Sequence, residues 1–173
     1  MSRDTRHRFS KPVVESITLV ENWGVQGDAH AGTTTQHRYL VKKDPTRANL
    51  TQVHLIQQEL FPELAERGFE VSPGNLGENI TTSGIDLLTL PLGTRLHLGS
   101  QAVVEVTGLR SPCSLINKFQ AGLMKALIAR DGDGQVIRKS GIMGIVVSGG
   151  EISAADVVTV ELPPEPWVAL DVV

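Results

Sequence analysis

The sequence of 173 residues contains a single cysteine, Cys113, and few aromatic side chains, since Phe, Trp and Tyr together make up 4% of the chain. One thiol excludes an internal disulfide, and it cannot supply the several cysteines that an iron–sulfur cluster or a structural zinc site requires. Two interpretations of Cys113 remain. It is either a small buried apolar residue, which is the common case for a lone cysteine, or a reactive thiol.

The chain also lacks blocks of like charge and long apolar runs. No run of Lys or Arg extends beyond Lys42 and Lys43, and the formal net charge is −3, so the basic footprint of a nucleic-acid-binding protein is absent. No stretch of about 18 apolar residues occurs, and the charged N-terminus is not followed by an unbroken apolar segment. We therefore expect no membrane span and no export signal. A free thiol fits the reducing cytoplasm, which is the expected location.

Three sequence motifs that define large enzyme classes are missing as well. There is no Gly-x-Gly-x-x-Gly and no Gly-Lys-Ser/Thr, which argues against a dinucleotide-binding fold and a P-loop. There is no Gly-x-Ser-x-Gly, so a serine hydrolase is not supported. Any chemistry in this protein must rest on other residues.

What is present predicts one mainly β domain, a barrel or a sandwich. The hydrophobic fraction of 40% suits a globular chain, with residues 1–173 as a single domain, a core over about 13–162 and a surface tail over 163–173. Glycines and prolines recur about every ten residues between short β-branched segments. The predicted strands cover residues 13–20, 78–82, 95–98, 103–107, 142–148 and 157–162.

Two segments have apolar residues at helical spacing. Residues 52–67 carry one apolar face, divided near Phe61 by Pro62 and ended by Gly68. A second helix is predicted from Ser114, as its N-cap, to Ile128. Residues 131–135 resemble a calcium loop only superficially and are predicted to form a plain turn.

The first group of chemically capable residues lies in a glycine-rich loop. It consists of Asp28 and His30, followed by His37 and Arg38. A polar turn explains the same composition, because Gly and Asp are common turn residues. A zinc site built from His30, His37 and Cys113 is disfavoured, since the spacing matches no common zinc pattern.

The second group, Asn75, Gly77, Glu78 and Asn79, precedes a predicted strand. Its glycines permit close approach of backbone N–H groups to a ligand, which fits recognition of a phosphate or a pterin. A glycine-built lead into a hairpin is the structural alternative.

The third group surrounds Cys113. The segment Thr107-Gly-Leu-Arg-Ser-Pro-Cys113 follows an alternating apolar run and precedes the predicted helix. The guanidinium of Arg110 and the nearby helix start create positive potential that favours a thiolate. Pro112 fixes its own backbone angle and so restrains the neighbouring thiol.

Taken in order, these motifs resemble the MOSC family, the C-terminal domain of molybdenum cofactor sulfurases. The matching segments are Gly27-Asp-x-His-Ala-Gly32, His37-Arg38, Val53-His-Leu-Ile56 with Glu59, Pro73-Gly-x-Leu-Gly-Glu-Asn-Ile-Thr-Thr82, Gly84-Ile-Asp-Leu87 and Thr107-x-x-Arg-x-Pro-Cys113. The resemblance covers most of the chain and is strongest to the small stand-alone bacterial branch.

The resemblance implies a fold similar to the β-barrel domain of pyruvate kinase, closed or partly open, with two or three short helices. It further implies that the protein binds the molybdenum cofactor (molybdopterin), with Cys113 as a molybdenum ligand. The expected activity is reduction of small N-hydroxylated compounds, with electrons from a separate reductase. The alternative is a non-enzymatic sulfur carrier that bears a persulfide on Cys113, supplied by a separate cysteine desulfurase. Pyridoxal phosphate binding is a further association of the family.

By the same resemblance, Cys113 is the catalytic residue and the metal ligand. The candidates for holding the cofactor are Asp28, His30, His37, Arg38, Asn75, Gly77, Glu78, Asn79, Thr107 and Arg110. A small-molecule substrate is expected, and neither nucleic acid nor membrane is an expected partner. The exposed strand edges of a partly open barrel make a homodimer an additional expectation.

Overall fold

The computed structural model describes residues 1–130 and 132–173, with the backbone alone for Arg38 and Tyr39. Its centre is a six-stranded sheet in the order β11, β5, β6, β9, β3, β4, antiparallel except for the β3–β4 pair. The strands are β11 (Val158–Glu161), β5 (Arg95–Leu98), β6 (Ala102–Leu109), β9 (Ile142–Ser148), β3 (Val53–Gln57) and β4 (Ile80–Thr82).

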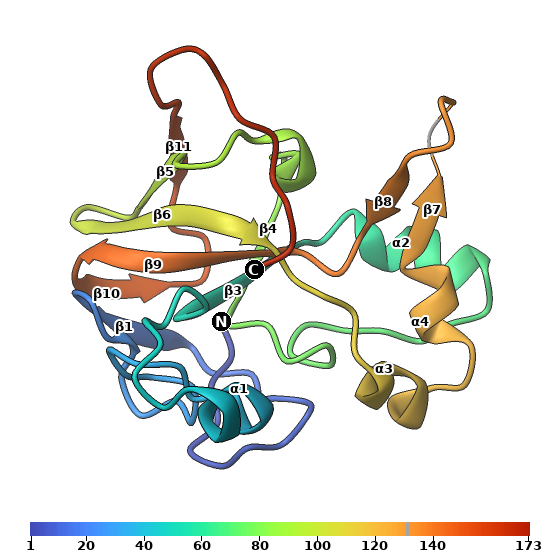
Figure 1. Ribbon diagram of the computed structural model, residues 1–173, viewed down its shortest axis with the longest axis horizontal. Coiled ribbons are helices and arrows are strands. Elements are labelled where there is room, and N and C mark those ends of the chain that lie inside the picture. Colours follow the sequence, from blue (N-terminus) through green and yellow to red (C-terminus); the bar gives the residue numbers. More distant parts are fainter. Residues whose placement is uncertain (131) are drawn as a thin grey trace.

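A second sheet of three strands closes over one side of the first. Its order is β10 (Gly150–Ser153), β1 (Ser16–Val20), β2 (Gly24–Val25). Only Gly149 separates β9 from β10, so one run of chain passes from the large sheet into the small one (Figure 1). A Cβ atom at Gly149 would lie 2.9 Å from the carbonyl oxygen of Leu19, which leaves no room for a side chain at this corner. The result is a curled half-barrel, as expected for the fold class.

The main hydrophobic core lies between the two sheets. Strand β6 alternates strictly, with Ala102, Val104 and Val106 buried and the intervening residues half-buried. Ile17 and Ile152 contribute to the same core from the small sheet. This alternation is the signature of strands with one face toward a core, and it is why the strands predicted from β-branched runs are confirmed.

The predicted helix over residues 52–67 is wrong in its first half. Residues Val53–Gln57 form strand β3, and only Leu60–Glu66 form a helix, α2. Strand β3 is buried on both faces, with Leu55 in the core between the sheets and Ile56 in a second core under the helices. A strand buried on both sides has no polar alternation, so its apolar residues also fit a helical spacing.

Short helices cover the other side of β3 (Figure 1). They are α2, α3 (Ser114–Phe119) and α4 (Leu123–Ala126), and the hairpin β7 (Ile128–Arg130) and β8 (Val136–Arg138) follows them. The single helix predicted over 114–128 is broken between α3 and α4: α3 ends at Phe119, Gln120 has an extended backbone, and Gly122, whose φ is +84°, is the N-cap of α4. Cys113, rather than Ser114, is the N-cap of α3.

Several smaller elements were not predicted from the sequence, among them strands β2 and β10. Helix α1 (Arg38–Lys43) and the 3-10 helix η1 (Leu87–Thr89) lie outside the sheets, and the β7–β8 hairpin replaces the end of the predicted second helix. Asp131, the first residue of the predicted turn, lies outside the described residues, and residues 132–135 lead into β8.

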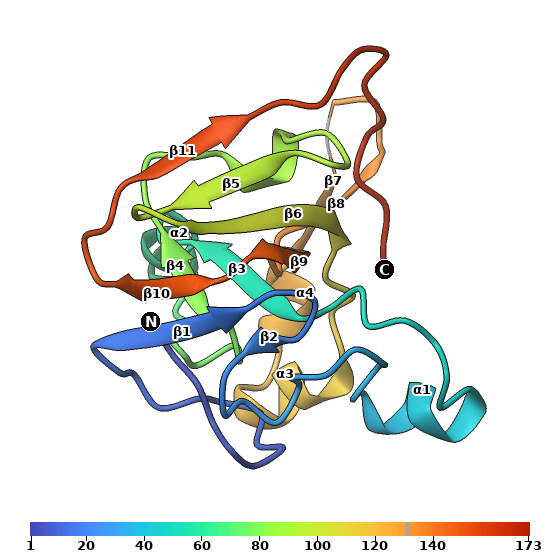
Figure 2. The ribbon, with the colours of Figure 1, turned by 90° about the vertical axis from the view of Figure 1, so that its left-hand side faces the viewer.

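Both ends of the chain are bound to the domain. Residues 163–173 lie on the surface and fold back along β6, where the Leu109 amide donates to the Asp171 carbonyl at 2.8 Å and Leu109 forms a parallel bridge with Val172. The N-terminal segment runs from β1 toward α3 in both views (Figures 1 and 2). None of the described helices is long and apolar enough to cross a membrane.

Candidate functional site

Strand β6 delivers Arg110 and Cys113 to the border between the barrel and the helices. The Arg110 amide donates to the Gly141 carbonyl at 3.0 Å, and the Ser140 hydroxyl donates to the Arg110 carbonyl at 2.8 Å. These two bonds hold the chain just beyond the strand. Three residues later, Cys113 is half-buried and packs against the core under the helices. The thiol is therefore neither a fully buried core residue nor a freely exposed one.

The guanidinium of Arg110 is the least satisfied polar group of the site. Its Nη1 atom is buried and has no hydrogen-bond partner among the described residues. The Phe9 ring lies against it, with 5.9 Å between the ring centroid and Cζ, and Phe9 in turn packs on Phe119 of α3 at 5.8 Å. Burial lowers the pKa of Arg110, while Cys113 and Glu78 act in the opposite direction. Arginine remains a cation under these conditions, so the site holds a positive charge without a full counterpart.

The loop 72–79 lies near Arg110, close enough for the Glu78 carboxylate to oppose the lowering of the Arg110 pKa by burial. Glu78 is fully buried, and its carboxylate accepts hydrogen bonds from the Gly74 amide and, at 3.2 Å, from the Leu76 amide. Burial raises the pKa of Glu78, against the effect of these amides and of Arg110. The loop amides are thus turned inward to Glu78 rather than outward to a ligand.

The glycines of this loop serve the approach of the N-terminal segment. A Cβ atom at Gly74, where φ is +84°, would overlap the Lys11 carbonyl oxygen. A Cβ atom at Gly77, where φ is +82°, would lie 2.5 Å from the Phe9 carbonyl oxygen. The two glycines therefore permit backbone to lie on backbone, and this contact carries Phe9 to Arg110.

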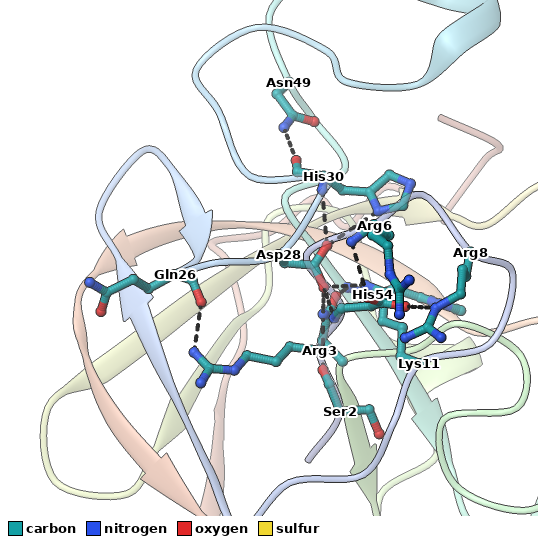
Figure 3. A network of polar contacts seen from close by, with 12 residues as sticks. Ser2, Arg3, Arg6, Arg8, Lys11, Gln26, Asp28, His30, Asn49 and His54 are labelled. Atoms are coloured by element: carbon teal, nitrogen blue, oxygen red, sulfur yellow. Dashed lines mark hydrogen bonds and ion pairs between the residues drawn. The ribbon is translucent and has the colours of Figure 1, made fainter.

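Asp28 organises the other half of the site (Figure 3). Its carboxylate lies 2.7 Å from Lys11 Nζ and accepts a hydrogen bond from Asn79 Nδ2 at 3.0 Å. The side chains of Lys11 and Asp28 are only 4% and 2% exposed. Burial lowers the pKa of Lys11, and the Asp28 charge opposes that effect. The Asn79 side chain also accepts from the His54 amide at 3.2 Å, so one network joins β3, the loop and the N-terminal segment.

Four histidines lie in or around the network. His54 is buried in β3 and its Nε2 lies 2.8 Å from the Ser140 carbonyl; burial holds its pKa well below the ordinary value. The rings of His7 and His30 meet edge to face at 5.0 Å. Burial also lowers the pKa of His37, with His30, Arg110 and His7 adding to the effect. The site therefore keeps His54 neutral and gathers the other imidazoles near a cation.

Most of the residues predicted from the sequence are brought together here. The N-terminal segment, the 28–30 loop, the start of α1, the 72–79 loop and the end of β6 meet, and they carry Asp28, His30, His37, Gly77, Glu78, Asn79, Arg110 and Cys113. Asn75 instead caps its own turn by accepting the Ser72 amide at 3.0 Å. Thr107 donates to the Leu50 carbonyl at 2.6 Å and so secures another loop. The side chain of Arg38 lies outside the described part of the structure.

The N-terminal segment supplies three residues of the site that the sequence did not indicate: His7, Phe9 and Lys11. The segment has no periodicity and no glycine pattern, and its charges indicate only a solvated terminus. The single signal in the sequence was the glycine pair at 74 and 77, which shows that something packs closely without showing what.

Fold and site together define a β half-barrel with a half-buried thiol, a buried cation lacking an acceptor and an ionised network beside them. Among the described residues no group of three or more His, Cys, Asp or Glu side chains is able to hold a metal ion. The arrangement suits a ligand that is anionic and that bonds to sulfur.

Comparison with known proteins identifies the family and agrees with the fold. The family model of the MOSC domain matches residues 42–159, more than half of the chain, and the protein therefore belongs to the MOSC domain family. No curated protein matches the chain in sequence.

Similar solved structures share the fold. YuaD of Bacillus subtilis has a TM-score of 0.74 at 23% identity, with 94% of this chain and 93% of that chain covered. YiiM of Geobacillus stearothermophilus has a TM-score of 0.60 at 24% identity, covering 88% of this chain and 64% of its own. YiiM of Escherichia coli has a TM-score of 0.62 at 17% identity, covering 96% and 70%. The chain thus spans about two thirds of the length of the YiiM proteins.

Proposed function

We propose that this protein binds the molybdenum cofactor at the site formed by Cys113 and Arg110, with the Cys113 thiolate as a ligand of the metal. The observation that carries the proposal is the buried Nη1 of Arg110, which has no partner among the described residues. A buried donor without an acceptor is costly, so an anionic ligand accounts for its position. The pterin of the cofactor carries a phosphate, and a guanidinium is well suited to bind one.

The thiol fits the metal end of the same ligand. A thiolate is a soft donor and suits a sulfur-coordinated metal centre. Because the described side chains offer no group of three or more metal ligands, a metal bound here must arrive with most of its ligands already in place. A metal held by the sulfur atoms of a pterin meets that requirement.

When bound, the cofactor supplies a centre that exchanges an oxygen atom and two electrons. The side chains of the protein bind the cofactor and exclude water from it. Arg110 would hold the phosphate, and the Phe9 ring beside it excludes water, which strengthens its charge interactions. We propose reduction of small N-hydroxylated compounds in the cytoplasm. The electrons come from a separate reductase, because a single cysteine cannot bind an iron–sulfur cluster.

A second function, sulfur carriage, is favoured by one observation. Cys113 is the only cysteine and is half-buried, so no second thiol is present to resolve a persulfide on it into a disulfide. In that case a separate cysteine desulfurase would load the thiol.

The deciding experiment is the molybdenum content per chain of protein purified without oxygen from a host that makes the cofactor. We expect molybdenum in the wild type, its loss in Cys113→Ser, and its retention in Ser111→Ala, a matched control at an exposed neighbour. Absence of molybdenum from the wild type would contradict direct ligation. A mass increase of one sulfur atom on Cys113 in that sample would support the carrier function instead.

A further inference from the structure

Asp28 and His30 form a carboxylate–imidazole pair whose geometry is defined on every side (Figure 3). Asp28 Oδ1 accepts the His30 amide at 2.9 Å and lies 3.2 Å from His30 Nδ1. Asp28 Oδ2 faces Lys11 Nζ at 2.7 Å, Asn79 Nδ2 at 3.0 Å and the Asp4 amide at 3.4 Å. The carboxylate therefore has no freedom to rotate, and the imidazole bonded to it is held in one orientation.

The ionisation of Asp28 decides which nitrogen of His30 carries the proton. Although burial raises the pKa of Asp28, the hydrogen bonds from His30 and Lys11 and the Lys11 charge hold it well below its ordinary range. An ionised carboxylate only accepts hydrogen bonds, so the proton of a neutral His30 must lie on Nδ1. The other nitrogen, Nε2, then carries the lone pair and is the atom that exchanges a proton with a ligand.

Nε2 of His30 is positioned to meet a ligand. Within the part of the chain whose side chains are described, nothing is hydrogen-bonded to it, and the side chain is 34% exposed. The His7 ring packs on His30 at 5.0 Å, and Phe9, two residues further along, packs on Arg110. In addition to burial, Asp28 and Arg110 both shift the pKa of Lys11, and His30 and Arg110 both lower the pKa of His37. His30 therefore borders the site of Arg110 and Cys113.

We propose that His30 is the proton donor of the reaction at the Cys113–Arg110 site, and that Asp28 and Lys11 are positioning residues for it. The inference rests on the proposed function in its reductase form. Reduction of R–NHOH takes up two electrons from a reduced flavin or iron–sulfur protein and two protons. The N–O bond breaks, and R–NH₂ and water are formed. In its protonated, imidazolium form His30 gives the Nε2 proton to the departing oxygen and is left as the neutral Nδ1–H tautomer; solvent supplies the second proton and then reprotonates Nε2.

The charged and titratable groups around the pair come from four places. The N-terminal segment contributes His7 and Lys11, the start of α1 contributes His37, and the end of β6 contributes Arg110. Asp28 lies on the same loop as His30. Replacing any of these groups would itself alter the pH dependence of the reaction. The test therefore replaces His30 and leaves the surrounding groups unchanged.

The test is His30→Gln, in which the glutamine amide still offers a donor to Asp28. Steady-state reduction of an N-hydroxylated amidine is measured with dithionite-reduced methyl viologen as the electron donor. We expect kcat to fall about 10²- to 10⁴-fold with molybdenum content unchanged. The alkaline limb of the pH–rate profile should disappear as well. The matched control is His97→Gln, which removes an exposed imidazole paired with Glu161 at 2.6 Å. This variant should change neither kcat nor the molybdenum content.

A second readout needs no activity. In ¹⁵N NMR spectra of the wild type, assigned with His30→Gln, the neutral His30 ring should show the Nδ1–H tautomer. The Nε2–H tautomer overturns the proposal. So does a kcat within threefold of wild type in a His30→Gln enzyme that retains its molybdenum. Loss of molybdenum from the wild type itself would overturn the proposed function and this inference together, so the two failures are distinguishable.

Discussion

Replacing Asp28 by Asn tests the ionised network most directly. The asparagine has the same shape, but the groups around this position are donors from Lys11, His30, Asn79 and the Asp4 amide. Whichever way the amide turns, its NH₂ group faces donors instead of accepting from them. The substitution also leaves the Lys11 ammonium without its counterion.

The expected loss of stability follows from the burial of Lys11. Breaking a buried ion pair by removing one partner costs about 3–5 kcal/mol. An independent upper limit comes from neutralising Lys11. Its ordinary pKa is 10.5, so deprotonation at pH 7 costs about 5 kcal/mol at about 1.4 kcal/mol per unit. We expect Asp28→Asn to lower the free energy of unfolding by about 3–5 kcal/mol.

Urea unfolding at two pH values checks both the size and the cause. In the variant, Lys11 binds its proton less tightly in the folded than in the unfolded state, so stability rises with pH up to the ordinary pKa of 10.5. The loss should therefore be smaller at pH 9.5 than at pH 7. Adding Lys11→Met should restore most of the stability, because no charge is then buried alone.

A surface pair provides the control. Glu105→Gln removes the partner of Arg95 at 3.2 Å, a pair that is largely exposed, and should cost less than about 1 kcal/mol. If Asp28→Asn costs no more than this control, or costs the same at both pH values, the account of a buried and ionised Lys11–Asp28 pair is wrong.

Three further outcomes are expected. Gly74→Ala should destabilise the protein by at least about 2 kcal/mol more than Gly68→Ala in urea unfolding, because both glycines have φ near +80° but only a Cβ at Gly74 meets backbone; equal losses would contradict this. His54 has a pKa lowered by burial, so its contribution to stability is complete above 6.5 and is lost as pH falls, by up to about 1.4 kcal/mol per unit. Thermal unfolding between pH 7.5 and 5 should show this slope, and His54→Gln should flatten it. Arg110→Met should keep or raise the stability of the cofactor-free protein by about 1–3 kcal/mol, because it removes a buried cation, yet abolish molybdenum retention; a variant that retains the metal refutes the anion-binding role.

The strands with one buried face were predictable from local pattern. In β6 and β9 the buried residues alternate with less buried ones, and a period of two in β-branched residues is typical of a strand that packs one face on a core. The same pattern failed for β3. Its residues face a core on each side, and only the presence of the second core under the helices makes the run Val53–Gln57 a strand.

The second predicted helix failed for a different reason. Its apolar spacing extends through Gly122, but Gln120 takes an extended backbone and Gly122 a positive φ, and these two residues divide the segment into α3 and α4. An isolated glycine in an apolar helical pattern is compatible with a continuous helix or with a break. The choice depends on how the two halves pack against α2, which no local window contains.

The chemical residues divide in the same way. Cys113, Arg110, Asp28 and His30 were identified from the order of short motifs, because each motif is local and its residue types are suited to thiol, anion and proton chemistry. That order was also sufficient to indicate the MOSC family, which the family model confirms.

The tertiary structure decided how those residues work. Lys11 becomes the counterion of Asp28, and Phe9 covers Arg110, only because the N-terminal segment lies on the glycines at 74 and 77. The burial of Arg110 Nη1, which has no partner among the described residues, and the contact of His30 Nδ1 with Asp28 depend on groups brought together from distant parts of the chain. Residue type sets which proton or ligand a side chain is able to bind, and the packed surroundings set its charge, its orientation and its exposure to water.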